Sequence, residues 1–311
     1  MTYIVICVLL IFSIFQINTK PSKLRIIGGR DADEDKYPYI VRLEKQYLIF
    51  EEVFPISDLQ LCTGAVVTPT WILTAAHCIF TENTTMLKNV TVRHAVRHGS
   101  LANNTLSGVM YTIVHPAYKL GITHLQNDVG LMKTEEITLN QYARVSAIDF
   151  GTLIGQEVTL TGYGITNSSE GLVGDATMIG KPLQMLDVVV VQCTNENLDA
   201  MMPAVCLARQ CGPSSGVCPG DSGGPMLHQS GVVGVNSLGP TELKKFCALK
   251  STEPIHDIAV ITPMSPYIDW ISKTIEKDVL LPDLIRKKRR KKHVVSRHKR
   301  ASAERASIIF I

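Results

Sequence analysis

Three short motifs, separated by long stretches of chain, restrict this sequence more than any other feature. They are Thr74-Ala75-Ala76-His77-Cys78, Asn127-Asp128-Val129-Gly130-Leu131 and Gly220-Asp221-Ser222-Gly223-Gly224-Pro225. A serine hydroxyl is a weak nucleophile at neutral pH; it needs an imidazole to take its proton and a carboxylate to orient that imidazole. A chain that uses His77, Asp128 and Ser222 together must therefore fold so that these three residues meet.

In content and order the motifs resemble those of the chymotrypsin-like serine endopeptidases, the trypsin family. The resemblance runs from Ile26 to about Leu281. It implies an all-β fold of two packed antiparallel β-barrels, a catalytic cleft between them and a closing C-terminal helix. It also implies that Ser222 is the nucleophile, His77 the general base and Asp128 the residue that orients it. The amides of Gly220 and Ser222 are then expected to form the oxyanion hole.

Short apolar or β-branched runs, separated by Gly, Pro or Asn, indicate many strands. We predict strands at residues 40–43, 64–67, 71–74, 90–96, 108–114, 129–132, 158–160, 186–191, 226–227, 231–235 and 258–262. Residues 44–60 are longer and more acidic than a simple hairpin needs, so we interpret them as an insertion near the cleft rim. Residues 265–281 have the apolar spacing of a helix, which Pro282 would end.

The N-terminal residues predict secretion and activation. Residues 1–18 contain an apolar run too short for a confident membrane span, typical of a signal peptide; an uncleaved anchor is the alternative. Residues 19–25 are then a propeptide. Arg25-Ile26-Ile27-Gly28-Gly29 resembles the family's activation site, where cleavage after Arg25 frees an ammonium group on Ile26 that pairs with Asp221. The activating protease must accept Arg, and the protease domain would span residues 26–281.

Eight cysteines are present, and Cys7 lies in the leader. A secreted chain permits disulfides, and the resemblance implies the pairs Cys62–Cys78, Cys193–Cys206 and Cys218–Cys247. Cys211 is left as a free thiol, an intermolecular link or a sign that the last pairings differ. Four Asn-x-Ser/Thr sequons predict glycosylated, exposed loops of an extracellular protein: Asn83, Asn89, Asn103 and Asn167.

The residues that the resemblance assigns to the specificity pocket carry no carboxylate. The pocket base, six residues before the nucleophile, is Gly216, followed by Val217; the walls map to Gly239 and Ala259, and Ser237 and Gly239 would contact the substrate strand. A substrate Lys or Arg side chain would lose its water there without gaining a partner. We expect cleavage after large apolar residues, with an elastase-like preference for smaller ones as the competing interpretation.

Charge divides the chain in two. Residues 26–281 carry a net charge of −9, whereas residues 282–311 carry +9. The tail is interpreted as a disordered, solvated extension; contact with a polyanion and processing at its Arg-x-Lys-Arg sequences are the alternatives. The leader and the disulfides exclude a nuclear address, so no specific nucleic-acid partner is expected.

We predict no cofactor and no metal. His94 and His98 would lie on a strand, where their spacing does not form a helical zinc site, and residues 83–127 lack the carboxylates that calcium prefers. The expected partners are protein or peptide substrates, the activating protease and serpin-type inhibitors, with the chain a monomer. The alternative function is a non-catalytic homologue that binds partners through the protease scaffold and the basic tail.

Overall fold

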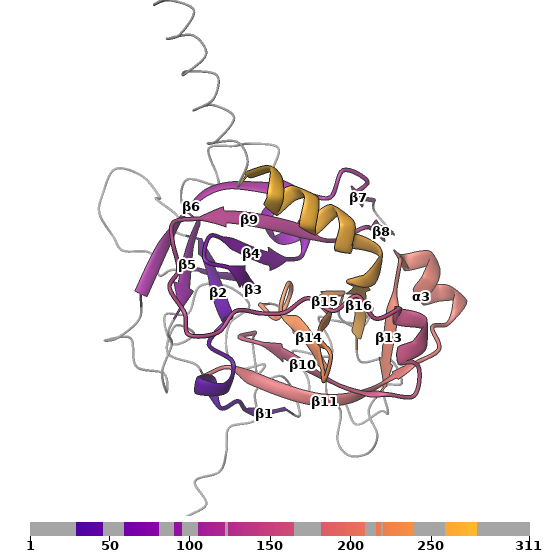
Figure 1. Cartoon of the computed structure of the whole chain (residues 1–311). Helices are drawn as coiled ribbons and strands as arrows, with labels where there is room; N and C mark the ends of the chain where they lie inside the picture. Colours follow the sequence, from indigo (N-terminus) through magenta and orange to yellow (C-terminus); the bar gives the residue numbers. More distant parts are fainter. Residues whose placement is uncertain are drawn as a thin grey trace, which may run out of the picture.

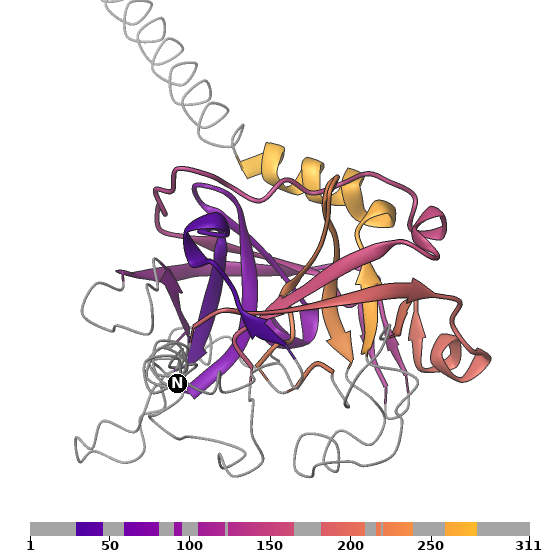
Figure 2. The ribbon, with the colours of Figure 1, turned by 90° about the horizontal axis from the view of Figure 1, so that it is seen from below.

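Strands make up most of the regular structure and close into two barrels, which the C-terminal helix crosses (Figures 1 and 2). The computed structural model describes residues 29–45, 59–80, 90–94, 105–121, 124–164, 182–208, 216–218, 220–238 and 259–278. Both barrels are antiparallel and the fold is chymotrypsin-like, as predicted.

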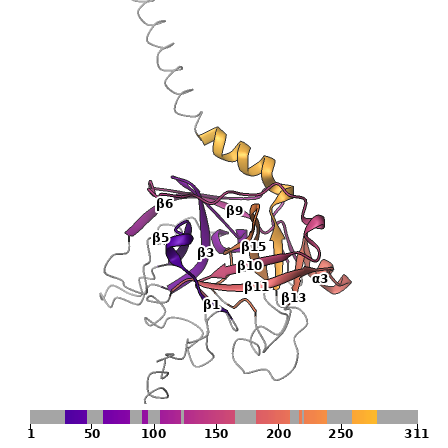
Figure 3. The same ribbon diagram turned by 60° about the horizontal axis from the view of Figure 1, so that its bottom comes forward.

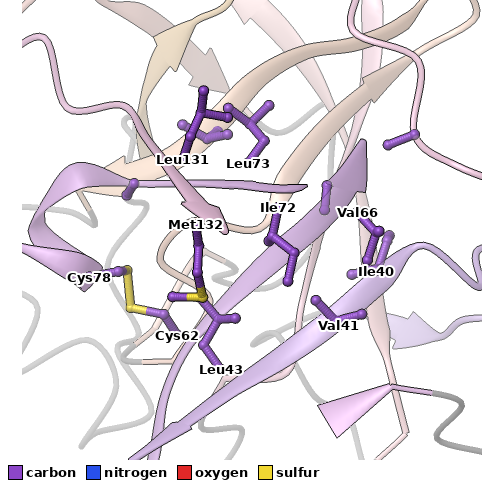
Figure 4. Packing of buried hydrophobic residues seen from close by; sticks show 14 of the residues in the cluster. Ile40, Val41, Leu43, Cys62, Val66, Ile72, Leu73, Cys78, Leu131 and Met132 are labelled. Atoms are coloured by element: carbon purple, nitrogen blue, oxygen red, sulfur yellow. A yellow bond between two sulfur atoms is a disulfide. The ribbon is translucent and has the colours of Figure 1, made fainter. Parts of the chain in front are cut away.

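The first barrel is built from six strands in the order β2-β3-β4-β9-β6-β5, and β5 pairs with β2 to close it. The strands are β2 (Ile40–Lys45), β3 (Leu59–Thr68), β4 (Trp71–Thr74), β5 (Val90–His94), β6 (Thr105–Val114) and β9 (Gly130–Thr134). Aliphatic side chains fill its interior, and Figure 4 shows Leu43, Ile72 and Met132 packed beside the Cys62–Cys78 disulfide. Burial of this apolar surface is the main force that holds the barrel together.

The second barrel has the order β11-β10-β14-β15-β16-β13, and pairing of β11 with β13 closes it. The strands are β10 (Glu157–Gly162), β11 (Gln184–Val191), β13 (Val205–Ala208), β14 (Pro225–His228), β15 (Gly231–Leu238) and β16 (Ala259–Pro263). The short strand β1 (Arg30–Asp31) adds to the edge of β11, so the first described residues lie against the second barrel (Figure 1).

Smaller elements decorate the two barrels. A three-stranded sheet joins β12 (Met201–Met202), β8 (Leu125–Gln126) and β7 (Lys119–Leu120). The short helices are η1 (Glu34–Lys36), α2 (Ala76–Ile79), η4 (Phe150–Leu153), α3 (Asn195–Ala200) and η6 (Ser265–Tyr267). Within the described residues, no helix is both long enough and apolar enough to cross a bilayer.

The helix at residues 268–278 follows η6 and packs on the first barrel (Figure 3). Ile271 belongs to the hydrophobic cluster of that barrel. Asp278, the last described residue of this helix, accepts hydrogen bonds from Lys133 on β9 and from the Tyr111 hydroxyl on β6, the latter at 2.8 Å. The helix that the spacing of Ile268, Ile271 and Ile275 predicts is therefore present, and contacts at Ile271 and Asp278 hold it on the first barrel.

A buried ion pair lies across two strands of the first barrel. Nε of Arg93 on β5 donates to Glu44 on β2 at 2.7 Å, and a second guanidinium nitrogen donates to the other carboxylate oxygen at 2.9 Å. Arg42 is completely buried nearby, with its guanidinium 4.8 Å from the centre of the Tyr163 ring. Burial lowers the pKa of Arg42. The barrel therefore holds charges that contribute to stability only while they remain paired.

The predicted strands are present, and in the first barrel β2, β3 and β6 are longer than predicted. β2 reaches Lys45 and β3 begins at Leu59, because Glu44 pairs with Gln60 and Lys45 with Leu59. The predicted insertion at 44–60 therefore contributes strand at both ends, and residues 46–58 lie outside the described part of the chain. His94 is the last residue of β5, as the strand prediction required, whereas His98 lies outside the described residues.

Candidate active site

His77 is held in place by the segment that leaves β4. All four residues of β4 are buried, and the chain then turns into the short helix α2, which carries His77. The next residue, Cys78, is bonded to Cys62 on β3 with a Cα–Cα distance of 6.1 Å. The predicted Cys62–Cys78 pair is therefore present, and it fastens the His77 segment to the neighbouring strand.

Asp128 lies in the connection between β8 and β9, directly beside His77. Its two carboxylate oxygens accept separate hydrogen bonds from that residue: Nδ1 of the imidazole at 2.7 Å and the backbone N–H at 2.8 Å. The hydroxyl of Ser237 on β15 donates to the same oxygen as the imidazole. Three contacts thus fix the carboxylate, and they bring together residues from both barrels.

The environment of Asp128 keeps it ionised although it is completely buried. Burial by itself would raise the pKa of its carboxyl, but the hydrogen bonds from His77 and Ser237 hold that pKa below the ordinary value. A carboxylate bonded to Nδ1 fixes the imidazole in the tautomer whose Nε2 can accept a proton. In this structure Nε2 of His77 lies 3.7 Å from Sγ of Cys78.

Ser222 lies in a tight turn that contacts the His77 segment. Gly223 has φ at +77°, and a Cβ built there would be 2.0 Å from the Thr74 hydroxyl oxygen and 3.0 Å from the Ala75 backbone nitrogen. Only glycine permits both this conformation and this approach. The described residues include no hydrogen bond between the Ser222 hydroxyl and His77. Such contacts are often long in unliganded enzymes and tighten when substrate binds.

The backbone around Ser222 is fixed so that its N–H points away from the protein interior. The carbonyl oxygen of Asp221 accepts hydrogen bonds from the N–H of Gly224 at 3.0 Å and from the Asn236 side chain at 3.1 Å. In a trans peptide the N–H points opposite to the C=O. Among the residues that the structure describes, the N–H of Ser222 donates to no backbone or side-chain acceptor, so it is available to an external oxygen.

Asp221 is completely buried behind the turn. Its carboxylate accepts hydrogen bonds from the N–H of Gly164 at 2.7 Å and the N–H of Cys218 at 2.9 Å. Burial raises the pKa of Asp221 to about 7, although these two bonds oppose the shift. Arg25 and Ile26, which the sequence pairs with this residue, lie outside the described part of the chain.

The predicted pocket residues are only partly described. Gly216 is buried, and Val217 and Ala259 belong to one hydrophobic cluster of the second barrel. Ser237 is buried against Asp128, whereas Gly239 lies outside the described residues. The described part of this region is therefore apolar except for the Ser237 hydroxyl.

Of the other sequence predictions, the Cys193–Cys206 disulfide is present. Cys218 is also bonded in a disulfide, and its predicted partner Cys247 lies outside the described residues. The same holds for Cys211 and for the four sequons at Asn83, Asn89, Asn103 and Asn167.

Sequence reasoning missed two residues that contact the site through the backbone. Thr63 donates its N–H to the carbonyl oxygen of Ser222 at 2.8 Å, and the Asn236 backbone carbonyl accepts from Gly223 at 2.7 Å. Thr63 follows Cys62, a predicted disulfide cysteine, and Asn236 precedes Ser237, which was predicted to contact substrate. The only sign in the sequence that these two residues lie at the site was this adjacency to predicted site residues.

Comparison of the sequence with known proteins agrees with this fold. The family model described as Trypsin matches residues 26–271. Trypsin from Phaedon cochleariae is 30% identical over 268 residues, which cover 84% of this chain and 92% of that protein. Brachyurin from Leptuca pugilator is 29% identical over 79% of this chain and 96% of its own length. Chymotrypsin-like elastase family member 1 from Macaca fascicularis is 27% identical, with 81% and 90% covered. The chain therefore belongs to the trypsin family and is a chymotrypsin-like serine endopeptidase.

Proposed function

We propose that this protein is a secreted zymogen that becomes active when it is cut between Arg25 and Ile26 and then hydrolyses peptide bonds through an acyl-enzyme on Ser222. One observation carries the proposal: a buried, ionised Asp128 is bonded to Nδ1 of His77 at 2.7 Å and is steadied by Ser237. This arrangement orients the imidazole for proton transfer at Nε2. A domain that only binds partners does not require an imidazole oriented in this way, so the arrangement favours the catalytic alternative.

The proposed reaction has two halves. In the first, Oγ of Ser222 bonds to the substrate carbonyl carbon while its proton passes to Nε2 of His77. The carbonyl oxygen becomes negative and is stabilised by the N–H groups of Gly220 and Ser222. His77 then gives the proton to the leaving amine as the C–N bond breaks. In the second half, water attacks the ester carbon by the same route and frees the acid.

Activation is proposed to supply a positive counter-charge for the Asp221 carboxylate, which has no cationic partner among the described residues. A buried carboxylate without a cation is costly, and the raised pKa of this residue reflects that cost. An ammonium group on Ile26 would neutralise the carboxylate and fix the adjoining turn that carries Gly220 and Ser222. Strand β1 at Arg30–Asp31, which follows Ile26 closely in sequence, is paired with β11 of the second barrel.

The proposed substrates are bonds that follow an apolar residue. Val217 and Ala259 are buried in a hydrophobic cluster, and Gly216 adds no side chain, so a cation in this region would be desolvated without a partner. Large aromatic or aliphatic side chains are proposed first, and smaller elastase-type ones second. Substrates with Lys or Arg before the scissile bond are expected to be poor.

The remaining features of the proposal come from the sequence. Residues 1–18 are the signal peptide, 19–25 the propeptide, 26–281 the protease domain and 282–311 a basic tail. An Arg-specific protease activates the chain, serpin-type inhibitors trap it, and the tail contacts polyanions by its charge. Retention on heparin that is lost on removal of residues 286–311 would support the last point.

The experiment that tests the proposal is hydrolysis of a peptide panel by the recombinant chain cut at Arg25–Ile26. The controls are the uncut chain, Ser222→Ala and Asp128→Asn. Turnover after Phe, Tyr, Leu or Ala in the cut wild type alone would support both the catalytic residues and the apolar pocket. Turnover only after Lys or Arg would overturn the pocket, and no turnover by correctly cut protein would overturn the mechanism.

A further inference from the structure

Thr63 on β3 touches the turn that carries Ser222 at two separate points. Its backbone N–H donates to the carbonyl oxygen of Ser222 at 2.8 Å, and its hydroxyl donates to the carbonyl oxygen of Gly220, also at 2.8 Å. The residue is completely buried. It belongs to the first barrel, whereas the turn belongs to the second, so these bonds cross between the barrels.

The direction of the hydroxyl proton follows from the other contacts of Thr63. The backbone N–H of Tyr163 donates to the Thr63 hydroxyl oxygen at 3.1 Å, so that oxygen already serves as an acceptor. The carbonyl oxygen of Thr63 is itself held by the Thr74 hydroxyl at 2.9 Å. The remaining hydroxyl proton therefore goes to Gly220, and the whole residue is fixed by partners from three other segments.

These two bonds hold two peptide units of the turn, one before Asp221 and one after Ser222. The carbonyl of Gly220 lies on the peptide that joins it to Asp221, and the carbonyl of Ser222 lies on the peptide that joins it to Gly223. A peptide unit is planar, so a bond to its carbonyl sets the orientation of the whole unit. Between these two units lies the peptide that joins Asp221 to Ser222 and carries the N–H of Ser222. Its carbonyl, that of Asp221, is also bonded, to Gly224 and Asn236.

We infer that Thr63 is a positioning residue for the oxyanion hole, whose hydroxyl holds the Gly220 carbonyl so that the N–H groups of Gly220 and Ser222 face one point. This inference rests on the proposed function of those two amides. The φ of Gly220 is +95°, a conformation open mainly to glycine, so rotation of the peptide that joins Gly220 to Asp221 is not restricted by a Cβ, and a bond to its carbonyl limits that rotation. The Thr63 hydroxyl supplies that bond from outside the turn.

The test compares three substitutions in the full chain cut at Arg25–Ile26. Thr63→Val keeps the shape and removes the hydroxyl, Thr63→Ala leaves room for a bridging water, and Thr63→Ser keeps the hydroxyl. Thr161→Val is the matched control, because Thr161 is equally buried and its hydroxyl donates to a carbonyl, that of Pro225, at 2.7 Å. For each variant kcat and KM are measured on one peptide with an apolar residue before the scissile bond.

The second readout is the inhibition constant of a peptidyl trifluoromethyl ketone, whose adduct with Ser222 places a negative oxygen in the oxyanion hole. We expect Thr63→Val to lower kcat by about 10- to 100-fold, because a small displacement of catalytic groups has effects of that order. KM should change little, and the inhibition constant should rise by the same factor as kcat/KM falls. Thr63→Ala should lie between Thr63→Val and the wild type, and Thr63→Ser should restore most of the activity. Thr161→Val should keep its kcat.

Several results would overturn the inference. One is an unchanged kcat and inhibition constant in Thr63→Val and Thr63→Ala. Another is a Thr63→Ser variant as impaired as Thr63→Val, because the hydroxyl would then not be the active group. Equal loss in Thr161→Val would assign the effect to general destabilisation. If Thr63→Val does not fold, Thr63→Ala and Thr63→Ser decide the question by the same two readouts. A wild type that fails to turn over substrate would overturn the proposed function itself, which is a separate outcome.

Discussion

Ser237 and His77 bond to the same carboxylate oxygen of Asp128, although they come from different barrels. The oxygen that orients the imidazole is thus steadied from β15 of the second barrel. Any motion of one barrel against the other would therefore disturb the position of the imidazole. This contact couples the packing of the two barrels to the geometry of proton transfer.

Ser237→Ala should weaken catalysis without unfolding the protein. The substitution removes one hydrogen bond to a charged group, a contact worth about 1.5–3 kcal/mol, and the pKa of Asp128 should rise. We expect kcat/KM to fall about tenfold, the factor that corresponds to 1.4 kcal/mol. Ser146→Ala is the control, because Ser146 is similarly buried and its hydroxyl lies 2.7 Å from that of Ser230. Equal loss of activity in the two variants would contradict the prediction.

The contribution of Asp221 to the stability of the uncut chain should fall as the pH rises from about 4 to about 7. Burial raises the pKa of Asp221 to about 7 from its ordinary value of 3.8. In that window the folded chain keeps a proton that the unfolded chain has released, so rising pH favours unfolding. Urea denaturation of Ser222→Ala at several pH values measures this slope without self-digestion.

Asp221→Asn in the same background is the comparison, because it removes the titrating group. We expect its stability to vary less across this window, by a few kcal/mol in total. Cutting at Arg25–Ile26 should also reduce the slope in the Asp221 protein, since the new ammonium would pair with the carboxylate. Identical slopes in Ser222→Ala and the double variant would show that Asp221 does not titrate in this range.

Gly223→Ala should abolish activity and cost several kcal/mol of stability. Its added methyl group would lie 2.0 Å from the Thr74 hydroxyl oxygen and 2.4 Å from the Thr63 carbonyl oxygen. Gly155→Ala separates this clash from the cost of a positive φ. Gly155 has φ at +82° and no atom within 4 Å of the added group, so that variant should lose only about 1–2 kcal/mol. Thermal melts and peptide hydrolysis of both variants give the comparison.

Glu44→Leu should destabilise the first barrel by about 3–5 kcal/mol, because it breaks a buried ion pair by removing only the carboxylate. The two residues share two hydrogen bonds of 2.7 and 2.9 Å. Replacing both Glu44 and Arg93 by leucine should cost much less than the sum of the two single changes, since the ion pair is removed as a whole. Chemical denaturation of Glu44→Leu, Arg93→Leu and the double variant completes the cycle, and strictly additive losses would contradict the predicted coupling.

The candidate catalytic residues could be found in the sequence because each lies in a short local motif. These motifs carry the resemblance to the trypsin family, which the family model confirms. That resemblance implied the two barrels and the Cys62–Cys78 and Cys193–Cys206 disulfides, which the structure contains. Strand lengths were less predictable. β3 begins at Leu59, five residues before the predicted start, because cross-strand pairing with β2 continues beyond the apolar run that marks the strand in the sequence.

The contacts that support the site could not be predicted from sequence. The Thr63 hydroxyl meets Gly220, a residue 157 positions later, and the Tyr163 amide, 100 positions later. A threonine in an apolar strand has no pattern that distinguishes a structural hydroxyl from one that holds a catalytic turn. Only the register of β3 against the neighbouring barrel decides which carbonyl lies opposite.

The anchoring of residues 268–278 on the first barrel has a consequence for biosynthesis. The strands that receive this helix, β6 and β9, leave the ribosome well before it does, and until it arrives Tyr111 and Lys133 lack their Asp278 partner. The first barrel is therefore synthesised early but completes its contacts only when residues 268–278 have been made. A chain truncated before this helix would also leave the first barrel without the bonds from Tyr111 and Lys133 to Asp278.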